Sequence, residues 1–450
     1  MRSKKYLIGV LAILALGGAF QTAEADTPGV DLTPFGAERR GNADGSIPDY
    51  TGEAIPVPPC YSASEPGYYC DPWNDKPLFS ITAQNLELYA DRLTDGQRSL
   101  FRAYPEFRMD IYPSRRTVRF PDYVLDNTLK NLSSCRTTED GNKIEGCYGG
   151  IPFPKPKTGH EVMWNHILKY TPINQQAKVK SILVDSTGRR ILLGEQNLWG
   201  TRFFNDPEND QPRSGNSLYA GVRVAVYAPV RRNGEQTMIL QDVSGRQRAY
   251  QYLPGQRRVK LAPDLAYDTP SPISGGVATM DQQELFYGQL DRYDFQYLGK
   301  KERFIIYNNF AGSDYKKCPE DVYFTKHYPN PDCTRWELHR VRVVEATLKP
   351  GFRHIMPKRK FYFDEDLSMA GTADSYDVSG NLFRIDNVVT FPLYAYGYGN
   401  LTNSTISIDL GRNSYGVGAF GGFPGGGYRV VDGLPASTWS PEIMAGTGIR

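Results

Sequence analysis

Short runs of aromatic and β-branched residues, separated by turn-forming residues, fill most of the chain after residue 177. The segment Arg335–Phe391 shows this pattern most clearly, because Pro, Gly, Asp and Ser close each of its hydrophobic runs. The pattern predicts four consecutive antiparallel strands, at residues 335–348, 354–363, 367–376 and 381–391.

Hairpin signals extend the pattern toward the N-terminus. Asp185–Gly188, Arg232–Gly234 and Leu253–Gly255 each separate two strand-forming runs. Another hairpin turn is expected at Gly299–Glu302, between strands at 293–298 and 303–307. Ten or eleven strands in local order predict one large, strongly curved antiparallel sheet.

Helical periodicity is confined to a few segments. It predicts helices at residues 82–93, 94–104, 122–132 and 159–170, and a short one at 281–287. The segment 159–170 carries an apolar stripe that includes His166, and such a stripe is more typical of a core than of a cofactor site. The fold class expected is α+β, mainly β, with helices packed on the concave face of the sheet.

The N-terminus has the features of a secretory signal peptide. Lys4 and Lys5 precede the apolar run Ile8–Leu16, and Ala23–Ala25 offers a cleavage site of small residues. Cleavage would make Asp26 the first residue of an exported, periplasmic protein. The alternative is an uncleaved anchor, although the apolar run is short for a membrane span.

Composition divides the rest of the chain into three parts. Residues 26–80 form an irregular, Pro-rich arm, residues 81–391 form the sheet domain with its helices, and residues 392–450 form a tail in which Tyr and Phe alternate with Gly. We expect partial disorder in this tail; strands at a site of close backbone approach are the alternative.

Six cysteines fit an oxidising compartment. Proximity along the chain favours the pairs Cys60–Cys70, Cys135–Cys147 and Cys318–Cys333, among 15 connectivities. A metal site is disfavoured, because Cys-x-x-Cys is absent and the five histidines are scattered. The net charge of +2 argues against a nucleic-acid partner.

Enzyme motifs are missing from the sequence. It has no Gly-x-Ser-x-Gly, His-Glu-x-x-His, phosphate loop or Rossmann glycine pattern. We therefore predict no catalytic residues, metal or cofactor. A hydrolase site assembled from distant residues stays open as an alternative.

Several segments, in order along the chain, resemble those of the proteobacterial envelope proteins grouped as domain-of-unknown-function family 1329. The matching segments are Asp31–Glu38, Asn42–Pro48, Lys76–Phe79, Tyr112–Arg116, Gly149–Pro154, Trp164–His166, Pro254–Val259, Asp291–Asp294 and Glu337–Gly351. That family is similar to the lipoprotein-sorting proteins LolA and LolB and to RseB. The resemblance implies an incomplete β-barrel closed by helices, with an apolar cavity for acyl chains.

Candidate ligand-binding residues lie mainly on the strand that begins at Trp336. The even-numbered residues of this strand are apolar except for Arg340 and Arg342. Three further candidates come from the segment Tyr112–Arg116, which ends in two arginines. The full set of cavity candidates is Trp336, Leu338, Arg340, Arg342, Val344, Ala346, Leu348, Tyr112, Arg115 and Arg116.

The two arginines on this strand allow three interpretations. A bulge could turn Val341 and Val343 inward instead, the arginines could meet a ligand carboxylate or phosphate, or they could pair with Glu337 or Glu345. The acidic segment Asp364–Asp366 is expected to be a solvated turn, with weak Ca²⁺ binding as the alternative.

These observations favour a periplasmic carrier, peripheral to the outer membrane, that holds a lipid or another hydrophobic small molecule. The family resemblance implies an exporter of the resistance-nodulation-division type and an outer-membrane protein as partners. A protein-docking or sensor subunit of an envelope complex is the second hypothesis.

Overall fold

The computed structural model of the chain describes residues 31–271, 274 and 276–447. The predicted signal peptide, residues 1–25, lies outside the described residues. Within them, no helix is both long enough and apolar enough to cross a membrane.

Sixteen strands of the described chain form a single sheet. In chain order they are β1 (Phe79–Ile81), β2 (Met109–Ile111), β5 (Asn174–Val184), β6 (Arg190–Thr201), β7 (Leu218–Ala228), β8 (Gln236–Asp242), β9 (Gln247–Leu253), β10 (Arg258–Leu261), β11 (Tyr293–Ile306), β12 (Trp336–Leu348), β13 (Lys358–Asp364), β14 (Gly371–Tyr376), β15 (Leu382–Pro392), β16 (Asn400–Asp409), β17 (Ser414–Phe420) and β18 (Gly427–Val430). The short strands β3 (Arg136–Thr138) and β4 (Lys143–Glu145) pair separately.

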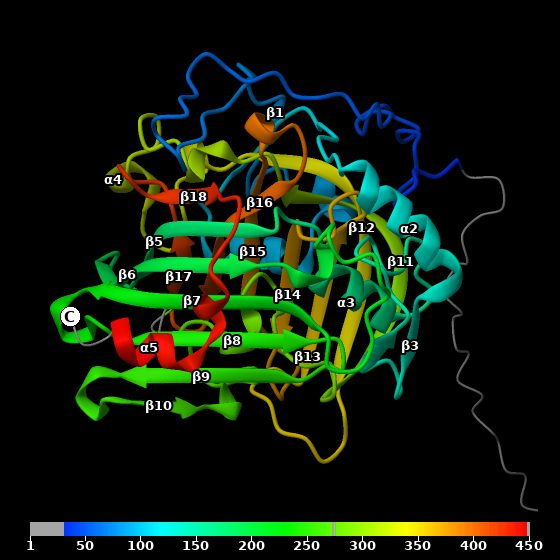
Figure 1. Cartoon of the computed structure of the whole chain (residues 1–450). Coiled ribbons are helices and arrows are strands. Elements are labelled where there is room, and N and C mark those ends of the chain that lie inside the picture. The colour runs from blue at the N-terminus through cyan, green and yellow to red at the C-terminus, as the bar shows by residue number, and fades with distance from the viewer. Residues whose placement is uncertain (1–30, 272–273, 275, 448–450) are drawn as a thin grey trace, which may run out of the picture.

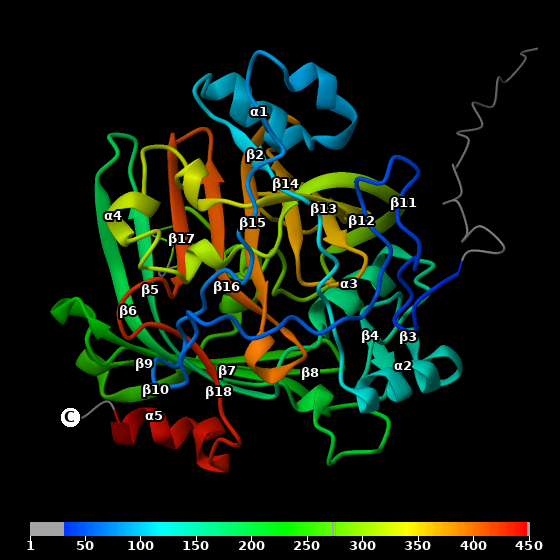
Figure 2. The ribbon, with the colours of Figure 1, turned by 90° about the horizontal axis from the view of Figure 1, so that it is seen from above.

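The sheet runs in the order β1, β2, β12 to β17, then β5 to β10, while β11 pairs with β12 and β18 with β5. All pairings are antiparallel except the contact of β2 with β12 at Trp336. Seen from above, β11–β17 and β7–β10 form two facing sides joined through β5 and β6 (Figure 2). The sheet is therefore an incomplete barrel, which confirms the predicted fold class.

Five α-helices of the described residues accompany the sheet: α1 (Asp95–Ala103), α2 (Asp122–Ser134), α3 (Gly159–Ile167), α4 (Glu320–Tyr323) and α5 (Pro441–Thr447). Helix α3 lies between the two sides of the sheet, whereas α1 and α5 lie outside it (Figures 1 and 2). A capping box of Thr94 and Gln97 begins α1. The segment expected to be helical from residue 82 contains a 3₁₀ helix, Leu86–Arg92.

Alternate residues of the central strands enter different cores. Val344, Phe361 and Ala373 pack with Trp164 of α3 in the interior. On the opposite face, Ile385 packs with Leu100 of α1 in a second core, which we call the outer core. Both faces of these strands are covered, so every residue from Trp336 to Val344 is buried. Sequence alternation in this segment therefore could not separate an inner face from a solvated one.

The predicted meander after Arg335 is confirmed by the pairing of β12 with β13, β13 with β14 and β14 with β15. The predicted hairpin at Gly299 is wrong, because β11 continues through it. A register shift between Tyr297 and Lys300 absorbs the extra residue, and Gly299 adopts a φ of +80° there.

The C-terminal segment differs from the expected disorder. Its residues form β16, β17 and β18, and β17 pairs with both β16 and β5. Glycines permit this packing: a Cβ on Gly427 would lie 2.2 Å from the carbonyl oxygen of Gly67. The Gly/aromatic alternation thus indicates close backbone approach, and these strands join the two sides of the sheet.

Three disulfides join Cys60 to Cys70, Cys135 to Cys147 and Cys318 to Cys333, as predicted. The last of these closes the insertion between β11 and β12, which packs on the outer core through Tyr323 and Phe324. The N-terminal arm, residues 31–78, has neither an α-helix nor a strand of the main sheet. Tyr68 anchors the arm by donating to Asp314 at 2.9 Å.

Candidate functional site

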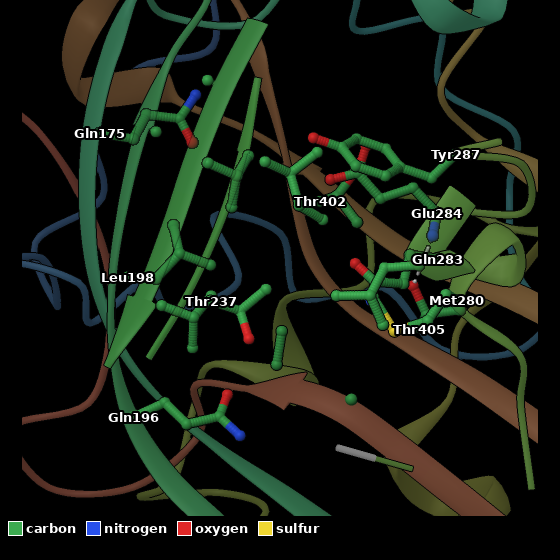
Figure 3. Close-up of a pocket in the computed structure, with 18 of the residues that line it drawn as sticks. Gln175, Gln196, Leu198, Thr237, Met280, Gln283, Glu284, Tyr287, Thr402 and Thr405 are labelled. Carbon is green, nitrogen blue, oxygen red and sulfur yellow. Dashed lines mark hydrogen bonds between the residues drawn. The ribbon is translucent and has the colours of Figure 1, made fainter. Parts of the chain in front are cut away.

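A cavity of about 200 Å³ lies inside the curve of the sheet. Strands β6–β9 form one wall, and the segment Met280–Tyr287 together with β16 forms the opposite wall. In Figure 3, Gln196, Leu198 and Thr237 stand on the first wall and face Met280, Tyr287 and Thr402 across the opening.

The strand wall is largely apolar because of regular alternation. Leu198, Val222, Val224, Val226 and Ile239 line the cavity. Neighbouring β7 residues point to the outer face, where Arg223 stacks on Trp199 at 4.9 Å. Val222 and Val224 are only half-buried, so apolar surface remains accessible inside the barrel. Such enclosed apolar surface is typical of sites for hydrophobic ligands.

Buried polar contacts fix the opposite wall. Gln282 donates to Asp386 at 2.8 Å, and Arg359 donates to the carbonyl oxygen of Leu285 at 2.7 Å. These contacts hold Glu284 and Leu285 in the left-handed region, at φ values of 49° and 75°. The segment Met280–Tyr287 is therefore held in one conformation against the sheet.

Charged residues lie together around Glu284, where the segment Met280–Tyr287 meets the end of β6. Glu284 lies 2.7 Å from Lys169 Nζ and 3.5 Å from a guanidinium nitrogen of Arg202. Burial alone would raise the pKa of Glu284, but these cations outweigh it and lower the pKa to about 2. Burial and the Lys169 charge lower the pKa of nearby His166 to about 3, so the imidazole is neutral. His166 stacks on Phe363 within the core, as predicted.

The sequence-predicted cavity residues lie elsewhere, and none of them lines this cavity. Trp336 and Leu338 belong to the outer core, while Val344, Ala346 and Leu348 pack around α3. Their role in ligand binding stays a prediction.

The remaining candidates form ion pairs or ring contacts. Tyr112 lies under the guanidinium of Arg335. Arg115 pairs with Asp75 at 2.7 Å, and Arg116 pairs with Asp366 at 2.6 Å. All of these contacts hold the arm and the adjacent loops against β12.

Arg340 and Arg342 bind the N-terminal arm. Arg342 donates to the carbonyl oxygens of Glu365 and Gly36 at 2.9 and 2.8 Å, and Arg340 pairs with the Glu365 carboxylate at 2.6 Å. The bulge considered for β12 is not found, because β12 pairs with β13 in regular register from Val341 to Thr347; the bulge lies instead in β11, between Tyr297 and Lys300. Internal pairing is the correct interpretation, although its partner is Glu365 and neither Glu337 nor Glu345.

The acidic segment Asp364–Asp366 is buried, which corrects the expected solvated turn. Lys300 lies 3.0 Å from Glu365, Arg116 pairs with Asp366, and His339 lies 3.1 Å from Asp364. Among the described residues, no group of three or more His, Cys, Asp or Glu could hold a metal ion.

A buried His–Asp pair also lies outside the cavity. His354 Nε2 is 3.1 Å from Asp281, and its Nδ1 accepts from the Met356 amide at 3.1 Å. Both ring nitrogens are therefore engaged, which leaves neither of them to activate a serine.

Sequence reasoning missed the residues that do line the cavity. In the run Gly221-Val222-Arg223-Val224-Ala225-Val226, valine recurs at every second position, and this signal indicates a strand with one face of β-branched residues. Arg202 and Tyr287 gave no such signal, since Arg202 lies just beyond the end of β6 and Tyr287 lies in a loop.

Comparison with known proteins decides the family. The model of the family described as protein of unknown function DUF1329 matches residues 80–440. The chain belongs to this family. An uncharacterised Pseudomonas aeruginosa protein, PA3922, is 36% identical over 396 residues, which cover 86% of each chain. The predicted family membership is thus confirmed.

Two crystal structures are similar to this DUF1329 protein at low sequence identity. A domain assigned to an outer membrane lipoprotein-sorting protein of Vibrio parahaemolyticus has a TM-score of 0.41 and 13% identity, covering 60% of this chain and 91% of that one. A DUF1329 protein of Desulfovibrio piger has a TM-score of 0.40 and 11% identity, with coverages of 61% and 92%.

Proposed function

We propose that this protein binds a lipid-like or other hydrophobic molecule in the cavity between β6–β9 and the segment Met280–Tyr287. The observation that carries the proposal is the apolar strand wall, which remains accessible inside an otherwise well-packed barrel. Protein interiors leave few voids larger than a water molecule, so a cavity of about 200 Å³ is unusual unless it receives a ligand.

The size of the cavity limits what it can hold in this conformation. Apolar cavities of about 150 Å³ are known to bind benzene. The observed volume therefore suits a small ring system or a short acyl chain. Burial of apolar ligand surface, at roughly 25 cal/mol per Å², would supply the affinity.

The proposed setting is the periplasm, reached through the predicted signal peptide. There the protein would shield its ligand from water and pass it between membrane partners. An exporter of the resistance-nodulation-division type and an outer-membrane protein are the partners that the family resemblance suggests. No cofactor enters this proposal.

Ligand extraction tests the proposal directly. Protein purified from the periplasm would be analysed by native mass spectrometry and by solvent extraction, and the emptied protein titrated with the fluorescent probe N-phenyl-1-naphthylamine. We expect a co-purifying apolar compound and saturable probe binding that this compound reverses.

A matched pair of variants locates the binding. Val224→Phe fills the cavity and should reduce probe affinity at least tenfold. Ala225→Phe adds a similar ring on the opposite face of β7, beside an open hollow, and should leave probe affinity within twofold. An empty protein that binds no probe, but forms a stable complex with an envelope protein, would instead support the docking hypothesis.

A further inference from the structure

Arg202 brings a cation with free donors into the cavity. It follows β6 immediately, and Gln196, Leu198, Gly200 and Arg202 all line the cavity at every second position. Its side chain is 14% exposed. Within the described part of the chain, its guanidinium has a single salt-bridge partner, Glu284, at 3.5 Å. A guanidinium carries five N–H donors, so most of them remain available to a ligand.

The local charge balance favours an anion. Glu284 is already matched by Lys169, whose side chain is 2% exposed and lies 2.7 Å away. Arg202 therefore leaves one uncompensated positive charge. The other charged pair lining the cavity, Arg232 and Glu235, is neutral by itself, with 2.7 Å between its charged atoms.

Tyr287 adds an unused donor on the facing wall. The residue is 8% exposed, and among the described residues its hydroxyl has no hydrogen-bond partner. Figure 3 shows its ring directed into the cavity, opposite the wall that carries Leu198. A buried hydroxyl without a partner is costly, and a ligand acceptor would remove that cost.

We infer that the ligand is an amphipathic acid, whose carboxylate binds Arg202 and Tyr287 and whose apolar part lies along Leu198, Val222 and Val224. This inference rests on the proposed function and names its ligand class. A single net positive charge matches a monoanionic carboxylate better than a phosphate dianion. An Arg guanidinium also presents paired donors that fit a carboxylate.

The geometry sets the length of the ligand. Leu198 and Arg202 are four residues apart, which corresponds to about 13 Å along an extended strand. A medium-chain fatty acid such as octanoate can therefore place its head at Arg202 and its chain over Leu198. Octanoate, 1-octanol and octyl phosphate differ in head group alone and serve as probes.

The test measures displacement of N-phenyl-1-naphthylamine by each probe at neutral pH. We expect octanoate to bind the wild-type protein at least tenfold more tightly than 1-octanol, and more tightly than octyl phosphate. Arg202→Gln should abolish the preference for octanoate while 1-octanol affinity stays within twofold. Tyr287→Phe should weaken octanoate binding several-fold. Arg232→Gln, which removes the other cavity guanidinium, should keep the preference.

The outcomes separate this inference from the proposed function. Equal affinities for octanoate and 1-octanol would overturn the head-group site and leave the cavity function standing. Tighter binding of octyl phosphate would overturn the carboxylate assignment. Failure of the wild-type protein to bind any of the probes would overturn both. The wild-type comparison requires no substitution, so the inference is testable even if Arg202→Gln does not fold.

Discussion

The Nδ1 atom of His339 lies 3.1 Å from Oδ2 of Asp364, with both side chains almost completely buried. The other ring nitrogen lies 3.1 Å from the Glu337 carboxylate. Burial alone would lower the pKa of His339, but the two carboxylates outweigh it and raise the pKa to about 9. The imidazole is therefore a cation at neutral pH and joins the arginines that hold the arm.

The raised pKa predicts a pH-dependent loss of stability. His339 stabilises the fold fully below its unfolded pKa of about 6.5, and this contribution disappears as the pH rises through about 9. The difference corresponds to about 3 kcal/mol in the free energy of unfolding. Urea unfolding at pH 6 and pH 9.5 should show that His339→Gln is much less stable than wild type only at the lower pH.

The control for this experiment is His327→Gln, because His327 is half-buried and stacks on Tyr104 without a carboxylate partner in the described structure. It should follow wild type at both pH values. A constant difference between His339→Gln and wild type would show that the imidazole acts only by packing.

Arg342→Met should destabilise the protein by about 2–4 kcal/mol without changing probe affinity. Arg342 is 3% exposed and donates to the carbonyl oxygens of Glu365 and Gly36, so its loss leaves both acceptors buried without a partner. Denaturant unfolding and limited proteolysis of the arm provide the measurements. Reduced probe affinity at unchanged stability would restore the view of Arg342 as a ligand-binding residue.

Removal of the disulfide between Cys318 and Cys333 should lower the free energy of unfolding by about 3 kcal/mol. The bridge spans 15 residues, and in the chain-entropy model a loop of this length restricts the unfolded chain by that amount. Chemical denaturation of the double Cys→Ser variant checks this value. A loss below about 1 kcal/mol would mean that the insertion is held mainly by its packing on the outer core.

Two truncations test the role of the C-terminal segment. A chain that ends at Phe391 lacks β17, which pairs with both β16 and β5, and it should not fold cooperatively. A chain that ends at Gly433 retains all the strands and loses only the outer helical segment with α5, so it should fold with reduced stability. Thermal unfolding followed by circular dichroism distinguishes the two. Cooperative unfolding of the shorter chain would contradict the structural role of these strands.

Local sequence patterns determined much of the fold. Turn residues around Gly234 and Gly255 marked real strand ends, and cysteine proximity gave the correct disulfides, because these features depend on a few neighbouring residues. At Gly299 the same rule failed, since pairing with the long strand β12 kept β11 continuous through a turn-like sequence. Tertiary context thus overrides a local turn preference where a partner strand supplies hydrogen bonds on both sides.

The sequence by itself determined the family, the mainly β class and the alternating strands. Tertiary structure alone decided where the cavity lies and what faces it. Arg340, Arg342 and Arg202 are equally charged in the sequence, yet the first two meet Glu365 and the arm, whereas Arg202 keeps free donors inside the barrel. Periodicity records which residues share a face. It does not indicate which distant carboxylates or carbonyls will neutralise a charge, because those groups come close to the charge only once the curved sheet has formed.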